Sequence, residues 1–323
     1  MRQPTLIVIG ASAGGVPALL ALTKSWREPL PVPILIVLHI GAQRSELPRL
    51  INSDCVMVAK HGEDGESLQP GVIYIAPPDR HMLVTDGHVR LTRGPKENWA
   101  RPAIDPLFRS AAEADGPGVV GVILTGKLND GTSGMFEVKR RGGVAIIQDP
   151  EDAAYPDMPR SAAAHVELDY CVPLAELPAL LERLVFETRE PELELPAQSI
   201  SEKGRDMTSS ETFDRPTTVT CPDCGGALRR TDQGALVKYD CHIGHSYTAE
   251  ILAEAQFDDM EKIMRAAVRV LNERAEFCRQ MADRGEDLGP PDDQSVWRRA
   301  SRQALERAYD LRNLVEQDWI RPA

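Results

Sequence analysis

Short apolar runs alternate with helical stretches over the first 187 residues of this 323-residue chain. A continuous apolar run is typical of a strand that is buried on both faces of a sheet, and apolar positions three and four residues apart indicate a helix. The predicted strands are 5–10, 33–38, 119–124 and 144–148, and the predicted helices are 16–26 and 132–141. This alternation predicts an α/β fold with a doubly wound, mostly parallel sheet and helices on both faces.

Residues 82–92 follow a different pattern, because apolar and polar residues alternate there. Asp86-Gly87 lies in the middle of the alternation, and an Asp-Gly pair between two such runs predicts a β-hairpin. We therefore expect an antiparallel excursion from the parallel sheet.

The rest of the chain divides by composition. After the α/β domain (1–187), residues 188–219 are rich in Glu, Pro, Ser and Thr without apolar periodicity, which predicts a flexible linker. Residues 220–248 contain three of the six cysteines and are expected to form a small Cys-rich module. In 249–323, apolar residues recur at three- and four-residue steps on both sides of a break with Gly and Pro, which predicts a helical hairpin. Its coiled-coil-like spacing favours docking of a partner or self-association, with a plain packed hairpin as the alternative.

Composition and charge exclude several classes of protein. Hydrophobic residues make up 42% of the chain and charged residues 27%, as in ordinary globular proteins. The net charge is −12 and neither half of the chain is basic, which argues against nucleic-acid binding. The apolar runs are far shorter than the ~18 residues of a membrane span, and the first residues lack a secretory signal pattern. We therefore expect a cytoplasmic protein without direct membrane insertion.

The segment Gly10-Ala-Ser12-Ala-Gly14 follows the first predicted strand and precedes the first predicted helix. It matches the G-x-S-x-G pattern, in which a sharp strand-to-helix turn exposes a nucleophilic serine. The backbone N–H of Ala13 would then face a developing oxyanion. The alternative is a Gly-rich phosphate-binding loop, although the segment lacks both G-x-G-x-x-G and the P-loop lysine.

Two further residues follow predicted strands at the edge where Ser12 lies. His39 comes directly after strand 33–38, and Asp130 lies just beyond strand 119–124. Because catalytic groups gather outside the carboxyl ends of parallel strands, these three residues predict a Ser-His-Asp triad. The structural alternatives are a buried histidine and an aspartate that caps the following helix. The residues that compete on position are Asp105 for the carboxylate and His61, His81 and His165 for the base.

Several motifs in one order along residues 4–186 resemble the catalytic domain of the chemotaxis protein-glutamate methylesterases, the CheB type. They are Ile9-Gly-Ala-Ser-Ala-Gly-Gly15, Leu38-His39, Pro70-Gly-Val-Ile-Tyr-Ile-Ala-Pro-Pro-Asp-Arg-His81, Arg101-Pro-Ala-Ile-Asp-Pro-Leu-Phe108, Leu124-Thr-Gly-Lys-Leu-Asn-Asp-Gly131 and Asp157-Met-Pro-Arg-Ser-Ala162. The resemblance implies a doubly wound sheet and hydrolysis of glutamate methyl esters on methylated chemoreceptors or a related signalling protein. It also implies deamidation of receptor glutamines. The family's triad carries over to Ser12, His39 and Asp130, and we expect no cofactor for catalysis.

The chain departs from the family pattern at three positions of the predicted site. Ala13 stands where the family often has Thr, which is a mild change if only the backbone N–H acts. Lys127 replaces a Met whose backbone N–H is thought to help bind the oxyanion, and Leu128 replaces a glycine. If that glycine has φ above zero, Leu128 would strain the loop. Two alternatives therefore stay open: a degenerate, non-catalytic binding or scaffold module, and a hydrolase of an ester outside chemoreceptors.

Three other polar residues in the motif loops, Arg101, Arg160 and His81, are expected to form structural ion pairs or caps rather than to contact substrate. The first predicted catalytic strand begins at residue 5, so we expect no receiver domain of the kind that usually precedes this domain.

Cys221-Pro-Asp-Cys224-Gly-Gly and Cys241-His-Ile-Gly-His245 form a second candidate site. Clustered cysteines in a cytoplasmic chain favour a metal over a disulfide framework. We interpret Cys221, Cys224, Cys241 and His245 as the ligands of a structural zinc ion, with His242 as the alternative fourth ligand. A small metal-free hairpin is the alternative. A redox C-x-x-C pair is disfavoured because no βαβ unit surrounds it, and haem attachment because no histidine follows the pair.

Overall fold

The computed structural model describes residues 3–39, 45–186, 219–233, 236–283, 296–317 and 319. The chain forms two compact units, 1–251 and 252–323. The predicted linker 188–219 lies outside the described residues except for its last residue.

The first unit is built around a seven-stranded sheet in the order β3-β4-β2-β1-β7-β8-β9. Every pair of neighbours in this sheet is parallel, which confirms the predicted α/β fold. Its strands are β1 (Leu6–Ala11), β2 (Ile34–Leu38), β3 (Val58–His61), β4 (Val72–Ile75), β7 (Val119–Ile123), β8 (Val144–Gln148) and β9 (Tyr170–Val172). The chain reverses direction of winding at β1, which pairs with β2 on one side and with β7 on the other. Such a switch point opens a crevice at the carboxyl ends of the strands.

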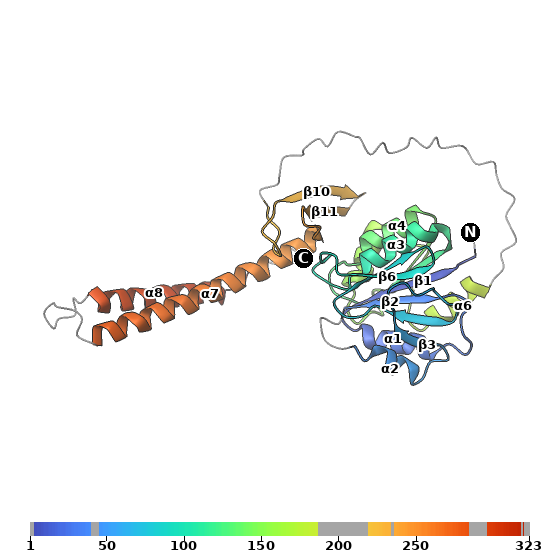
Figure 1. Cartoon of the computed structure of the whole chain (residues 1–323), viewed down its shortest axis with the longest axis horizontal. Coiled ribbons are helices and arrows are strands. Elements are labelled where there is room, and N and C mark those ends of the chain that lie inside the picture. Colours follow the sequence, from blue (N-terminus) through green and yellow to red (C-terminus); the bar gives the residue numbers. More distant parts are fainter. Residues whose placement is uncertain are drawn as a thin grey trace. The chain divides into compact units, whose positions relative to one another are not determined.

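Helices cover both faces of this sheet, which is why its strands are apolar throughout (Figure 1). Ile7 and Ile9 of β1 pack on one face, and Leu6 and Val8 pack on the other. The first face is covered by α1 (Gly15–Lys24), α2 (Leu47–Asn52) and α6 (Leu177–Phe186). The second face is covered by α3 (Ile104–Asp115), α4 (Thr132–Arg140) and α5 (Asp157–His165). A short 3-10 turn, Gly116–Gly118, leads from α3 into β7.

The predicted hairpin is present as β5 (His81–Thr85) and β6 (His88–Thr92), which form a two-stranded antiparallel sheet of their own. Asp86 and Gly87 at the turn have φ of 48° and 73°, and positive φ at both central residues is characteristic of the tight turns that suit a hairpin's twist. The hairpin packs on the second face of the large sheet through Met82, Val84 and Val89.

The Cys-rich module, residues 220–248, contains a three-stranded antiparallel sheet in the order β10-β11-β12. Its strands are β10 (Leu228–Gln233), β11 (Leu236–Cys241) and β12 (Ser246–Thr248). The module belongs to the same compact unit as the parallel sheet.

The second unit contains a helix pair, as predicted. α7 (Ala249–Asp283) begins in the first unit, and α8 (Val296–Val315) returns along it. The Ser301 hydroxyl donates a hydrogen bond to the Ala275 carbonyl at 2.8 Å, and the Phe277 and Trp297 rings meet edge to face with centroids 6.1 Å apart.

One stripe of α7 stays largely exposed. Ile263, Val270 and Phe277, spaced seven residues apart, are 61%, 53% and 56% exposed. Partner docking or self-association through the helical hairpin stays a prediction. In the described part of the chain, no helix is both long enough and apolar enough to span a bilayer.

Candidate active site

Three neighbouring strands of the parallel sheet end at the predicted triad. Ser12 follows β1, His39 follows β2, and Asp130 lies between β7 and α4. The Nδ1 atom of His39 is 3.1 Å from Ser12 Oγ, and its Nε2 atom is 2.8 Å from Asp130 Oδ2. A proton on Nε2 donates to the carboxylate and leaves Nδ1 as the acceptor for the serine hydroxyl. The structure therefore brings all three residues together in one hydrogen-bonded chain.

Asp130 is held as an anion despite being buried. Burial alone would raise the pKa of this carboxyl, but hydrogen bonds from His39, the Ile104 N–H and the Asn98 amide outweigh burial and lower it. The Ile104 N–H donates to Oδ2 at 2.6 Å, and Asn98 Nδ2 donates to Oδ1 at 2.7 Å. Ile104 begins α3, so the carboxylate also lies at the positive end of a helix dipole. An ionised, oriented carboxylate is what a histidine base requires.

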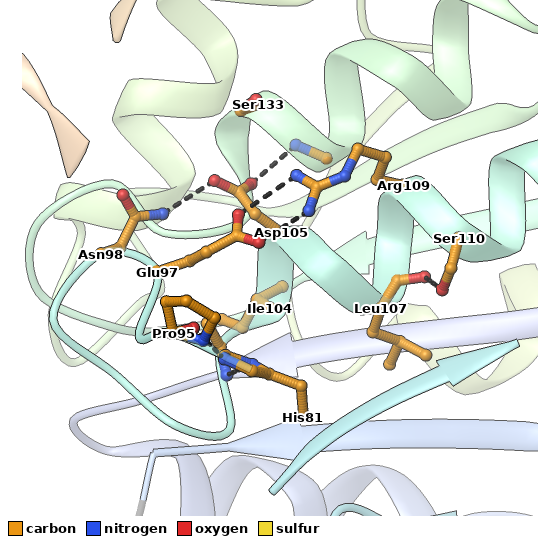
Figure 2. Close-up of polar contacts among 12 residues, drawn as sticks. His81, Pro95, Glu97, Asn98, Ile104, Asp105, Leu107, Arg109, Ser110 and Ser133 are labelled. Atoms are coloured by element: carbon orange, nitrogen blue, oxygen red, sulfur yellow. Dashed lines mark hydrogen bonds and ion pairs between the residues drawn. The ribbon is translucent and has the colours of Figure 1, made fainter. Parts of the chain in front are cut away.

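The competing carboxylate, Asp105, has a different role. It is fully buried and accepts from Asn98 Nδ2 at 2.7 Å and from the Gly134 N–H at 2.6 Å (Figure 2). Among the hydrogen bonds of the described residues, the His39 ring reaches Asp130 and not Asp105. Burial, together with the charge of Asp130, raises the pKa of Asp105 to about 6. Asp105 therefore joins the start of α3 to the start of α4 rather than orienting the base.

Close backbone approach positions the serine. The Ser12 N–H donates to the Thr125 carbonyl at 3.0 Å, and the Thr125 hydroxyl donates to the Ala13 carbonyl at 3.0 Å. A Cβ on Gly126 would lie 2.0 Å from Met158 Sδ and 2.9 Å from Ser12 Cβ, so only glycine fits there. Hydrogen bonds and close packing thus join the loop after β1 to the loop after β7 around the serine.

The two predicted oxyanion donors lie in these same two loops. The backbone N–H groups of Ala13 and Lys127 donate to no acceptor among the described residues. Leu128 has φ of 62°, the left-handed conformation anticipated for the family's glycine. The loop after β7 nevertheless places Asp130 within hydrogen-bond distance of His39. The Lys127 ammonium lies 5.5 Å from the centre of the Tyr155 ring.

The other polar residues of the motif loops make structural contacts, as expected. Arg101 pairs with Asp79 at 2.7 Å, and Arg160 lies 3.2 Å from Glu151. His81 is buried, its Nε2 is 2.9 Å from the Pro95 carbonyl, and burial lowers its pKa (Figure 2).

All seven histidines lie in described residues, and among the hydrogen bonds of these residues only His39 reaches Ser12. His61 and His165, the remaining competitors for the base, face backbone carbonyls, and His88 beside the hairpin turn is exposed.

Comparison with known proteins identifies the family. The profile of the CheB methylesterase family matches residues 7–181. The chain belongs to the CheB methylesterase family. A candidate protein-glutamate methylesterase/protein-glutamine glutaminase of Leptospira interrogans is 38% identical over 180 residues, which are 55% of this chain and 93% of that protein. A protein-glutamate methylesterase/protein-glutamine glutaminase of Pyrococcus abyssi is 37% identical over 185 residues, 55% of this chain and 50% of that protein.

The fold agrees with a solved structure of this CheB family. The crystal structure of the Thermotoga maritima CheB methylesterase catalytic domain superposes with a TM-score of 0.54 at 35% identity, over 57% of this chain and all of that one. Against relatives such as that of Pyrococcus abyssi, the match spans about half of the relative's length. The match to the CheB family profile ends before the Cys-rich module begins.

The cluster in this module has the spacing of a metal site. Its four ligand atoms, from Cys221, Cys224, Cys241 and His245, all lie within 4.8 Å of one another. The Cys224 and Cys241 sulfurs are 3.7 Å apart, and His245 Nδ1 lies 3.6 Å from Cys221 Sγ and 3.5 Å from Cys241 Sγ. Tetrahedral zinc, with bonds of about 2.3 Å to sulfur and about 2.0–2.1 Å to nitrogen, places ligand atoms about 3.6–3.8 Å apart. These residues can therefore hold a metal ion. His242, the alternative ligand, is exposed and outside the cluster.

Sequence reasoning missed three residues beside the triad: Asn98, Asn129 and Thr248. Asn98 joins Asp130 to Asp105, and the Thr248 hydroxyl donates to Asn129 Oδ1 at 2.7 Å. Asn98 lies in an irregular loop and Thr248 far along the chain, so no periodic pattern marks either of them.

Proposed function

We propose that this CheB-family chain is a protein-glutamate methylesterase that also deamidates glutamines, with methylated chemoreceptors as its substrates. The observation that carries the proposal is the hydrogen-bonded chain from Ser12 through His39 to Asp130 at the carboxyl ends of β1, β2 and β7. The activities named for the matching relatives, and the solved catalytic domain, support the reaction class.

The proposed mechanism is acyl transfer. His39 Nδ1 takes the hydroxyl proton as Ser12 Oγ attacks the methyl-ester carbonyl, and the Nε2–H bond to Asp130 stabilises the resulting imidazolium. His39 then returns the proton to the departing methoxide, so methanol leaves and an acyl-enzyme remains. His39 then takes a proton from water as the water oxygen attacks the acyl carbonyl, and it gives that proton to Ser12 Oγ as the bond to the serine breaks and the glutamate carboxylate leaves. In deamidation the leaving group is ammonia.

The oxyanion of the tetrahedral intermediate would accept hydrogen bonds from the Ala13 and Lys127 backbone N–H groups. These donors have no other acceptor in the described residues, and each such donor contributes about 10²–10³ in rate. Because both act through the backbone, Ala13 and Lys127 can differ from the family pattern without loss of the donors.

A methanol-release assay on membranes that carry methylated chemoreceptors tests the proposal. We expect release by the wild type and by Ser110→Ala, and none by Ser12→Ala. Ser110→Ala is a matched change away from the triad, in a hydroxyl that donates to the Leu107 carbonyl and accepts from the Val84 N–H. A folded wild type that releases no methanol but is labelled at Ser12 by a fluorophosphonate would indicate a different ester substrate. Absence of both reactions would indicate a degenerate binding module.

We also propose that the Cys-rich module binds one structural zinc ion through Cys221, Cys224, Cys241 and His245. The ion would supply no step of the reaction; bound there, it stabilises a module whose own apolar core is small. Metal content measured on protein purified without added metal tests this proposal, and less than ~0.2 zinc per chain would refute it.

A further inference from the structure

The Cys-rich module is joined edge to edge with a loop of the catalytic domain. One edge of β12 pairs with β11. On its other edge the Asn98 N–H donates to the Ser246 carbonyl at 2.7 Å, and the Ser246 N–H donates to the Lys96 carbonyl at 3.4 Å. The Lys238 ammonium also reaches Ser133 Oγ, at 3.4 Å. The module is therefore bonded to the segment that leads into α3 and to the first turn of α4.

Thr248, the last residue of the module, binds two side-chain amides of the catalytic domain. Its backbone N–H donates to Asn98 Oδ1 at 3.3 Å, and its hydroxyl donates to Asn129 Oδ1 at 2.7 Å. Thr248, Asn98 and Asn129 are 0%, 6% and 3% exposed, so water does not replace these contacts. Asn129 Nδ2 in turn donates to Glu250 at 2.7 Å. Thr248 thus fixes which way each amide points.

Both amides adjoin Asp130. Asn98, with its oxygen held by Thr248, directs Nδ2 at Asp130 Oδ1 and Asp105 Oδ2, at 2.7 Å each. Asn129 is the residue directly before Asp130. Asn98 and Trp99 have φ of 50° and 62°, a conformation that persists only where the surroundings hold it. Loss of the Thr248 contacts would free the loop and the amide that orient the carboxylate.

The metal cluster lies at the other end of the same strand. His245 directly precedes β12, Cys241 ends β11, and the Cys241 N–H donates to the His245 carbonyl at 2.9 Å. A metal ion bound by Cys241 and His245 would fix the turn between β11 and β12, and with it the position of β12. In small modules, the free energy of metal binding is free energy of folding.

We propose that Thr248 is a positioning residue for Asp130, and that metal in the Cys/His cluster holds it there, so that acylation of Ser12 depends on the module. The inference rests on the proposed triad but not on the identity of the substrate.

The test measures the rate at which a fluorophosphonate labels Ser12 in the full chain, because labelling needs the triad but no receptor. Thr248→Val keeps the side-chain shape and the backbone N–H bond to Asn98, but it removes the hydroxyl that donates to Asn129 and accepts from the Ile251 N–H. Thr248→Ser keeps that hydroxyl, and Thr231→Val makes the matched change on exposed β10. We expect Thr248→Val to slow labelling about 10- to 100-fold, the usual range for a group that orients a reacting residue. Thr248→Ser and Thr231→Val should stay within about twofold of the wild type.

A chelator titration covers the outcome in which Thr248→Val fails to fold. Zinc content, labelling rate and circular dichroism are followed together as metal is withdrawn. We expect labelling to fall in proportion to zinc while the α/β signal persists. Labelling at the wild-type rate in metal-depleted protein, or in folded Thr248→Val, would overturn the inference. A wild type that is not labelled at Ser12 would instead overturn the triad itself, whereas labelling without methanol release would overturn only the receptor substrate.

Discussion

Replacing Asp130 by asparagine converts one acceptor oxygen into a donor at a carboxylate that five N–H groups surround. Oδ2 accepts from His39 Nε2 at 2.8 Å and from the Ile104 N–H at 2.6 Å. The donors to Oδ1 are Asn98 Nδ2 at 2.7 Å, the Gly131 N–H at 3.0 Å and the Asp105 N–H at 3.3 Å. An asparagine can accept at only one of the two positions.

The geometry decides which position takes the new NH2 group. At the Oδ1 position it would oppose three donors, whereas at the Oδ2 position it opposes only the Ile104 N–H once His39 reverses its tautomer. The asparagine therefore faces His39, whose proton then moves to Nδ1 and points at Ser12. The base is lost, and we expect the rate to fall by about 10⁴-fold. The buried Ile104 N–H would then face the new NH2 group instead of an acceptor, which should lower the free energy of unfolding by roughly 1–3 kcal/mol.

Fluorophosphonate labelling of Ser12 and urea denaturation measure the two effects separately. Asp169→Asn is the matched control, because Asp169 accepts from Lys139 Nζ at 2.6 Å and the Ala145 N–H at 2.8 Å, away from the triad. It should reduce stability and leave labelling within about threefold of the wild type. If Asp130→Asn keeps more than about a tenth of the wild-type rate, the reasoning from tautomers is wrong.

Substitutions at four further positions test other parts of the structure. Leu128→Gly relieves roughly 1–2 kcal/mol of left-handed strain against roughly 0.5–1 kcal/mol of chain entropy, so urea denaturation should show equal or slightly higher stability, whereas β-branched Leu128→Val should lower it. Because burial raises the pKa of Asp105 from 3.8 to about 6 on folding, its protonation stabilises the fold fully below pH 4, and this stabilisation is lost as the pH rises through 6. Denaturation curves of Asp105→Asn should lack this fall, and an unchanged pH slope would contradict the assignment. Cys241→Ser should reduce zinc by at least about tenfold on elemental measurement, and retained zinc would exclude Cys241 as a ligand. Val270→Glu should shift sedimentation from an oligomer to a monomer, and identical sedimentation would count against self-association through α7.

The local pattern of apolar and polar residues predicts much of the fold. The strands β1, β2, β7 and β8 are apolar at nearly every position, without alternating polar residues. Both faces of the sheet must therefore be buried, whichever helices pack on them. The Asp86-Gly87 turn likewise determined its hairpin, because few residue pairs accept positive φ at both positions. The edge strand β9 is short and only partly apolar, so it becomes a strand through pairing with β8 rather than through its own sequence.

The same logic extends to the triad. Ser12, His39 and Asp130 each follow a parallel strand, and parallel strands end at one edge of a sheet, so the three residues could be placed together before any coordinates. Which nitrogen of His39 faces Ser12 depends on how the imidazole packs, and the sequence holds no sign of it. The pairing of Asp105 with Asp130 through Asn98 was hidden for a similar reason, because an amide between two carboxylates has no spacing rule.

What the sequence determined by itself was therefore the four central strands of the parallel sheet, the hairpin, the edge where the central strands end, and two clusters of reactive side chains. Only the tertiary structure decided that the Cys-rich module bonds to the loops beside Asp130, through Thr248, Asn98 and Asn129. The reason is physical: periodicity reports which side of an element is buried, whereas the partner that buries it is chosen by shape and hydrogen bonding between segments more than 100 residues apart.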